Sequence, residues 1–190
     1  MSPHRQGMLQ PPVQAGDHVT GSADASVTLV EYGDFQCPYC YQAHPIVLAL
    51  QKKLGERLRF VFRNFPLSEL HPHALHAAEA AECVAAHAGE TAYWRMHHAI
   101  YEHQQDSADA LDDAHLALYA AQSGGDPDRL TTDLDSGAHV ERVKSDFVSG
   151  VRSGVNGTPT FFINGVRFEG DWTDVKGFVA ALEEAAHTSV

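Results

Sequence analysis

Apolar residues at the start of this chain follow the spacing of strands and then of a helix. Val27 to Val30 form an apolar, largely β-branched run inside a predicted strand over 26–33. Apolar residues alternate with arginines over 57–63, which predicts a second strand. Residues 38–54 between them are predicted to form a helix, and Pro45 should kink it. These elements make a β-α-β unit, which connects parallel strands through a right-handed crossover.

The middle of the chain has helical periodicity. Apolar residues recur at helical spacing in three stretches: 74–88, 93–100 and 140–151. Residues 111–122 supply a further helix. Asp126-Pro127 is typical of an N-cap followed by the first helical residue. The pattern predicts four or five helices between about residues 70 and 153.

The chain then returns to strand character before a last helix over 173–187. Asn164-Gly165 separates two apolar runs, and this pair is preferred in two-residue hairpin turns. We therefore predict an α/β fold in which a sheet domain is interrupted by an all-helical insertion. The expected segments are a flexible lead-in, the first half of the sheet domain, the helical insertion, and the second half with a hairpin and helix: 1–21, 22–69, 70–153 and 154–190.

Composition limits the partners and the compartment. A chain of 190 residues with 44% hydrophobic content is long enough for one globular core. A net charge of -12 argues against binding nucleic acid or an anionic membrane by general electrostatic attraction. Residues 1–20 contain no apolar signal-peptide core, and no apolar stretch could span a bilayer. We expect a cytoplasmic protein, although a processed periplasmic chain would look the same.

Cys37-Pro38-Tyr39-Cys40 carries the main chemical signal, because it lies between a predicted strand and a predicted helix. Cys37 is expected at the helix N-terminus, where free N–H groups favour a thiolate and lower the thiol pKa. Cys40 lies one turn later, within disulfide reach. A structural disulfide and half a zinc site are the alternatives. Cys83 is the only other cysteine, so zinc is disfavoured and no metal is expected.

The remaining cysteine and the histidines give weaker signals. Cys83 borders an alanine stripe, and core packing is favoured over a regulatory or second redox role. Six histidines of the predicted helical region were weighed as metal ligands: His71, His73, His76, His97, His98 and His103. Histidines scattered among polar residues are more typical of solvated helix faces.

Four features together resemble the DsbA-like branch of the thioredoxin superfamily over about residues 20–188. They are the Cys37 to Cys40 dithiol, Pro45, the Gly157-Thr158-Pro159-Thr160 loop and Glu31. The amino-acid sequence around the dithiol is especially similar to that of bacterial DsbA-like domains, including those fused to sodium/proton antiporters. The resemblance implies a thioredoxin fold with an inserted helical subdomain.

The resemblance also implies roles for residues outside the dithiol. Thr158-Pro159 would be a cis bond beside the dithiol that presents backbone groups to a substrate, whereas an ordinary trans Pro remains the alternative. Glu31 would be a buried acid that accepts and returns the Cys40 proton. A carboxylate at a solvated sheet edge is the other interpretation of Glu31.

The implied activity is thiol–disulfide exchange with protein or peptide substrates, with the Cys37–Cys40 disulfide as the only redox group and no cofactor. Glutathione or a thioredoxin-type protein would recycle it. A glutathione-linked reductase or transferase and a chaperone-like binding module remain alternatives. Tyr39 replaces the His of strongly oxidising relatives, so we predict a potential near about -200 mV, as in glutaredoxins.

Overall fold

The computed structural model describes residues 7–188, which divide into two compact units. One unit, here called the sheet unit, combines the chain up to Gly33 with residues 42–63 and those from 148 onward. The other, the helical unit, contains residues 34–41 and 64–147. The cysteine segment therefore groups with the inserted helices, and the last turns of the helix that ends at Arg152 group with the sheet. These boundaries differ from the sequence-based ones at both points.

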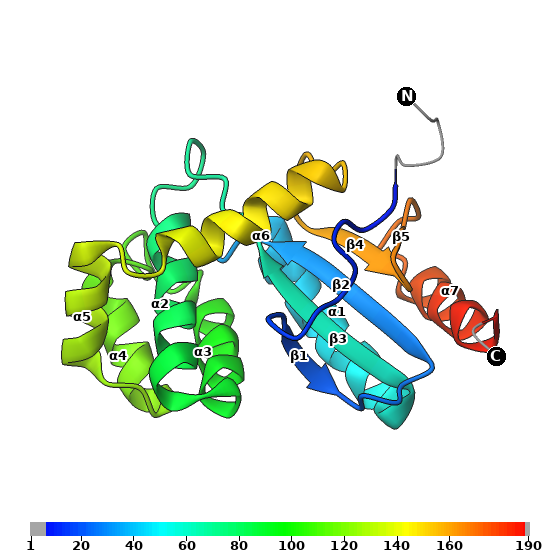
Figure 1. Cartoon of the computed structure of the whole chain (residues 1–190), viewed down its shortest axis with the longest axis horizontal. Helices are drawn as coiled ribbons and strands as arrows, with labels where there is room; N and C mark the ends of the chain where they lie inside the picture. Colours follow the sequence, from blue (N-terminus) through cyan, green and yellow to red (C-terminus); the bar gives the residue numbers. More distant parts are fainter. Residues whose placement is uncertain (1–6, 189–190) are drawn as a thin grey trace. The chain divides into compact units, whose positions relative to one another are not determined.

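The sheet unit is built on five strands in the order β1-β3-β2-β4-β5 (Figure 1). The strands are β1 His18–Gly21, β2 Val27–Gly33, β3 Leu58–Asn64, β4 Thr160–Ile163 and β5 Val166–Arg167. β4 runs antiparallel to both β2 and β5, and β1 runs antiparallel to β3. All seven residues of β2 are buried, as expected for a continuous apolar run in the centre of a sheet.

Two helices complete the elements expected around the sheet. α1, Pro38–Leu54, connects the neighbouring strands β2 and β3, and its bounds match the prediction. α7, Val175–Thr188, packs on the sheet through Phe178, whose ring centroid lies 5.1 Å from that of Phe161 on β4. Burial of these aromatic rings holds the helix against the sheet.

The predicted hairpin between β4 and β5 is confirmed. Asn164 and Gly165 have φ values of 47° and 82°, so both occupy the left-handed region that this two-residue turn requires. The Asn164 side chain also accepts a hydrogen bond from the Thr28 N–H at 2.8 Å. The turn thereby fixes the register of β4 against β2.

The helical unit holds the insertion predicted from the apolar periodicity. Its helices are α2 Ala74–Ala88, α3 Glu90–His103, α4 Asp113–Ser123, α5 Pro127–Ser136 and the first part of α6 Val140–Arg152. Asp126 caps α5 as predicted, because its side chain accepts hydrogen bonds from Asp128 and Arg129 N–H. Gly137, with φ 63°, ends α5 and separates it from α6.

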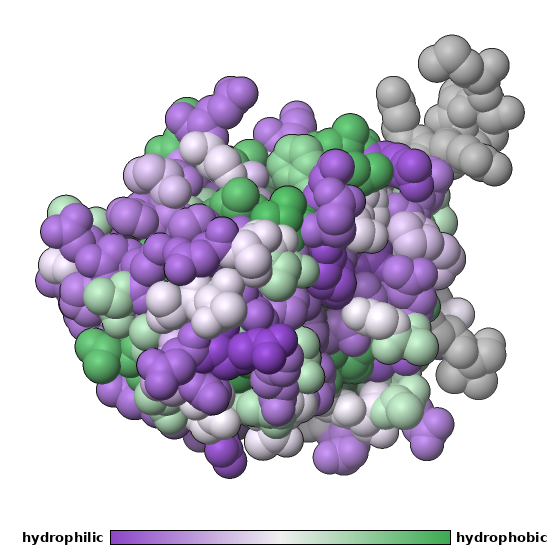
Figure 2. Space-filling model, turned by 60° about the vertical axis from the view of Figure 1, so that its left-hand side comes forward, coloured by the Kyte–Doolittle hydropathy of each residue, from purple (hydrophilic) through white to green (hydrophobic). Residues whose placement is uncertain are grey.

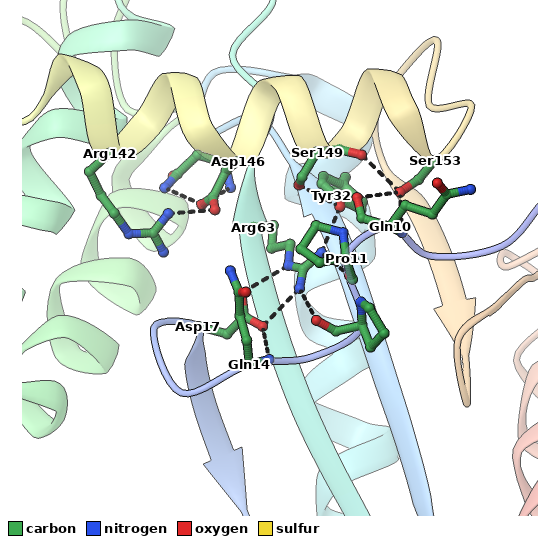
Figure 3. Close-up of polar contacts among 12 residues, drawn as sticks. Gln10, Pro11, Gln14, Asp17, Tyr32, Arg63, Arg142, Asp146, Ser149 and Ser153 are labelled. Atoms are coloured by element: carbon green, nitrogen blue, oxygen red, sulfur yellow. Dashed lines mark hydrogen bonds and ion pairs between the residues drawn. The ribbon is translucent and has the colours of Figure 1, made fainter.

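The prediction of a flexible lead-in over 1–21 is wrong for residues 7–21, and residues 1–6 lie outside the described part of the chain. β1 forms a ladder with β3, and Leu9 is buried. Asp17 forms an ion pair with Arg63 in which both side chains are buried (Figure 3). The segment was missed because backbone pairing and one distant arginine order it, and neither leaves a periodic pattern in the sequence.

Arg63 joins this segment to the sheet through all five of its N–H groups. Two bonds of 2.9 and 2.8 Å reach the Asp17 carboxylate, and a third of 2.9 Å reaches the Tyr32 hydroxyl. The other two donate to the carbonyls of Pro11 and Pro12. Burial acts to lower the pKa of Arg63, but the bonds to Asp17 and Tyr32 raise it above its usual value. The guanidinium is therefore a fully satisfied buried charge.

Hydrophilic side chains cover most of the face drawn in Figure 2, with smaller hydrophobic areas among them. This agrees with the acidic composition. Among the helices of residues 7–188, none combines the length and the apolar content needed to cross a bilayer.

Candidate functional site

The two cysteines of the motif lie at the start of α1. Cys37 immediately precedes the helix, and its carbonyl accepts a 3.1 Å bond from the Tyr41 N–H, which makes it the N-cap residue. Cys40 lies in the first turn. Both cysteines are buried, Cys37 being 3% exposed. By contrast, Tyr39 between them is 60% exposed, so the motif presents an aromatic ring to solvent.

Asp34 organises the turn that leads into the motif. Its buried carboxylate accepts bonds from the Gln36 N–H at 2.7 Å and the Leu67 N–H at 2.8 Å, and one oxygen lies 2.7 Å from His71 Nδ1. The Asp34 N–H in turn points at Cys40 Sγ, 3.4 Å away. A donor aimed at this sulfur favours its negative form over the neutral thiol.

A second set of bonds holds the backbone before Cys37. Gln104, just after α3, donates from Nε2 to the carbonyls of Phe35 and Cys37 at 2.7 and 3.1 Å. The Gln36 side chain accepts from the His73 N–H at 2.7 Å. Sequence reasoning missed Asp34 and Gln104 as site residues. The similarity of the residues just before Cys37 to DsbA-like domains was a signal for Asp34, whereas nothing in the sequence pointed to Gln104.

His97 corrects the expectation that the histidines of the insertion lie on solvated faces. It is buried on α3, with its ring centroid 5.4 Å from Phe35 and 5.1 Å from Tyr101. His76 and His103 do follow the expectation, since both are partly exposed and lie 2.7 Å from exposed aspartate oxygens. The rings of His97 and Tyr101 pack against Phe35 and so stabilise the turn before Cys37.

The sheet unit contains the other residues predicted for the site. Glu31 lies on β2 opposite Phe161 and is buried, so a solvated sheet-edge position is excluded. Gly33 leaves room next to it, because a Cβ there would lie 2.3 Å from the Phe62 ring. The Thr158–Pro159 peptide bond is cis and directly precedes β4.

The register of β2 and β4 relates these residues to the motif through the chain itself. Tyr32 pairs with Thr160, so the end of β2 and the start of β4 lie at the same end of the sheet. The Thr160 hydroxyl donates to the Gly157 carbonyl at 2.7 Å, which closes the loop around Pro159. From the same end, Gly33 continues into Asp34 and the cysteine segment.

Comparison with known proteins points to one family. A family model described as Thioredoxin matches residues 14–184. BdbD from Bacillus subtilis has a similar structure, with a TM-score of 0.86 and 24% identity over 96% of this chain and 99% of that one. Alpha-DsbA1 from Wolbachia pipientis gives 0.78 and 20% over 93% and 94%. The catalytic domain of Proteus mirabilis ScsC gives 0.76 and 19% over 94% and 93%.

Among curated proteins, similar sequences occur within proteins named sodium/proton antiporter NhaA. That of Herminiimonas arsenicoxydans is 41% identical over 93% of this chain, and NhaA 1 of Mycolicibacterium vanbaalenii is 36% identical over 93%. The chain spans only 27% and 28% of the length of these two relatives. The similarity therefore concerns one part of each antiporter protein.

Proposed function

This chain belongs to the thioredoxin family, and on that premise we propose that it is a thiol–disulfide oxidoreductase that exchanges disulfides with protein substrates through Cys37 and Cys40. Its DsbA-like fold is consistent with oxidoreductase activity at the family level. The observation that carries the proposal is the position of Cys37 as the N-cap of α1, with Cys40 in the first turn and a backbone N–H aimed at its sulfur.

In the reducing direction, the Cys37 thiolate attacks one sulfur of a substrate disulfide. The substrate disulfide breaks, one substrate thiolate leaves, and a mixed disulfide forms. Cys40 then loses its proton and attacks Cys37 Sγ, which releases the second substrate thiolate and leaves a Cys37–Cys40 disulfide. Two electrons pass from the dithiol to the substrate. The oxidising direction reverses these steps.

The surrounding residues are assigned supporting roles in this proposal. Glu31 accepts the Cys40 proton and returns it in the reverse direction, for which a buried carboxyl is suited. Thr158 and Pro159 bind the substrate backbone. Asp34 and Gln104 are positioning residues, because they hold the turn before Cys37 without taking part in the chemistry. Exposed Tyr39 contacts the partner, and we expect a potential near about -200 mV.

Insulin reduction with dithiothreitol as the electron donor tests the activity. The intact protein should accelerate insulin precipitation, and Cys37→Ala should return the rate to the uncatalysed level. Asp24→Asn is the control, because Asp24 is exposed on the loop before β2 and lies outside the motif. Unchanged turnover in Cys37→Ala would contradict the proposal.

The nature of the partner can be read from a trapping variant. In Cys40→Ser the resolving thiol is missing, so Cys37 should accumulate as a mixed disulfide with protein substrates. Mass spectrometry of the trapped species would identify them. If glutathione alone were trapped, and if insulin were not reduced, a glutathione-linked activity would replace the proposed one. Client holding without any turnover would favour a chaperone-like module.

A further inference from the structure

A second cysteine in the helical unit lies among side chains that the proposed redox chemistry does not use. Cys83 and His87 are four residues apart on α2, which places them on one face of the helix. Asp133 comes from α5, and His139 lies just before α6. One ligand-type atom from each of these four residues lies within 4.8 Å of all the others.

The other three side chains converge on one carboxylate oxygen of Asp133. Asp133 Oδ2 lies 3.0 Å from His87 Nε2 and 2.9 Å from His139 Nε2, and Cys83 Sγ donates to it at 3.4 Å. The other carboxylate oxygen, Oδ1, is held separately by Arg129 Nε at 2.9 Å. Arg129 thus fixes the orientation of the carboxylate and leaves Oδ2 for the cluster. Such outer contacts are typical of groups that orient metal ligands.

We propose that Cys83, His87, Asp133 and His139 form a zinc site. The sequence alone had led us to expect no metal. One sulfur, two imidazole nitrogens and one carboxylate oxygen match the donor types of tetrahedral zinc, and thiolate and imidazole disfavour magnesium or calcium. In such a site, bonds of about 2.0–2.3 Å separate ligand atoms by roughly 3.3–3.8 Å. The two imidazole contacts of Asp133 Oδ2, at 2.9 and 3.0 Å, would therefore open by about 0.3 Å around an ion, and the ligand atoms that lie up to 4.8 Å apart would approach by about 1 Å.

Charge and proton balance are consistent with this assignment. Zinc with one thiolate, one carboxylate and two neutral imidazoles forms a site with no net charge, which suits a site in which Cys83 and Asp133 are buried. Burial and the hydrogen bond to Asp133 raise the pKa of Cys83 to about 12, so the thiol is protonated when no metal is bound. Binding therefore breaks one S–H bond, forms a Zn–S bond and releases the proton to water, without any redox change.

A complete set of four protein ligands leaves no open position, which is the mark of a structural rather than a catalytic zinc site. The ion would connect α2 to α5 and to the turn before α6. Glu79, one turn before Cys83 on α2, accepts a hydrogen bond from the His139 backbone. The turn before α6 therefore already contacts α2. The site would lock the arrangement of the helical unit.

Metal binding can be tested without interference from the redox cysteines. In a Cys37→Ser/Cys40→Ser variant, Cys83 is the only remaining cysteine. Titration with Co²⁺ should saturate at one ion per chain and give a thiolate-to-cobalt charge-transfer band that Zn²⁺ then abolishes. Adding Cys83→Ser should remove this band. Saturating Zn²⁺ should also raise the melting temperature of the parent variant, because it binds the folded state.

His87→Gln gives a second variant that leaves the packed core in place, since the His87 side chain is 35% exposed. We expect zinc affinity to fall by more than about 10-fold. That is the smallest loss typical when a residue that only contacts a metal ligand is changed, and His87 would itself be a ligand. His76→Gln is the matched control, because His76 also lies on α2 and also contacts an aspartate, but lies outside the cluster. Circular dichroism checks that each variant is folded.

Two results would overturn the zinc site. One is the absence of saturable Co²⁺ or Zn²⁺ binding in the Cys37→Ser/Cys40→Ser variant. The other is binding that persists unchanged in both Cys83→Ser and His87→Gln. Because none of these measurements uses the redox reaction, the outcome is independent of the insulin assay.

Discussion

Cys40 and Cys83 are both buried thiols of the helical unit, but their surroundings are opposite. The sulfur of Cys40 accepts a backbone N–H from Asp34, at the start of a helix. The thiol of Cys83 donates to the Asp133 carboxylate, in the interior of α2. A donor stabilises a thiolate and a carboxylate destabilises it, so burial alone does not decide whether a cysteine reacts. The hydrogen-bond partner of the sulfur acts together with burial.

The largest effect expected from this contrast is in alkylation. Because the pKa of Cys83 is raised to about 12, only a very small fraction of it is thiolate at pH 7.5. Cys83 should therefore react with iodoacetamide roughly 1,000-fold more slowly than an unfolded cysteine. Intact-mass kinetics on Cys37→Ser/Cys40→Ser, with chelator present, would measure this.

Cys37 shares the helix start with Cys40 and is the attacking thiol of the proposal, so it supplies the comparison. In the Cys40→Ser variant it should react faster than the unfolded reference. The Cys83 rate should also keep rising about tenfold per pH unit through pH 9. Equal rates for the two cysteines would remove the basis of the contrast.

The second effect concerns the buried acid beside the motif. In Asp34→Asn, an amide NH₂ replaces one carboxylate oxygen, so either the Gln36 N–H at Oδ1 or the Leu67 N–H at Oδ2 faces a donor. We expect a loss of about 3 kcal/mol of unfolding free energy, measured with urea. Insulin turnover should fall as well, because the turn before Cys37 loosens.

Asp24→Asn serves as the control for this variant, since Asp24 lies on the exposed loop before β2 and its change should cost little. A wild-type stability for Asp34→Asn would show that the carboxylate does not organise the turn.

The third effect is a pH-dependent stability that comes from Asp133, the hydrogen-bond partner of Cys83. Burial opposes ionisation of Asp133, but hydrogen bonds from His139, His87, Cys83 and Arg129 hold the pKa of this carboxyl well below its usual value. Its contribution to stability is therefore complete above about pH 4 and is lost as the pH falls toward the folded-state pKa.

Asp133→Asn should lower the unfolding free energy by about 2 kcal/mol at pH 7, and the difference from wild type should shrink below pH 4. Urea titrations at pH 7, 4 and 3 would follow it. A difference that stays constant over this range would mean that the charge of Asp133 is not what stabilises the cluster.

The smallest effect tests the uncharged hydrogen bonds from Gln104 that hold the turn before Cys37, here called the frame. Gln104→Ala removes the bond accepted from Gln105 and the two bonds donated to the carbonyls of Phe35 and Cys37, which should cost about 1 kcal/mol. Exposed Gln122→Ala on α4 is the matched control and should stay within experimental error. If insulin turnover falls more in Gln104→Ala than stability predicts, the frame positions Cys37 as well as stabilising it.

The elements that the sequence predicted well are those defined by contiguous residues. The bounds of α1, the Asp126 cap and the Asn164-Gly165 turn depend on nearest neighbours along the chain, so local residue types were sufficient. The dithiol was equally visible, because its two cysteines are separated by only two residues. The segment at residues 7–21 was predicted wrongly, since its order depends on Arg63 and on pairing with β3.

By itself, then, the sequence determined the order of the helices and of strands β2 to β5, and it located the two cysteines of the motif. Only the tertiary structure decided which polar groups surround each thiol. Gln104 reaches the Cys37 carbonyl across 67 residues, and Asp133 reaches Cys83 across 50. Hydrogen bonds over such separations form only after helices have packed, and packing follows from burial of the whole apolar surface rather than from any local pattern. The two cysteine environments therefore differ for reasons that no window of sequence contains.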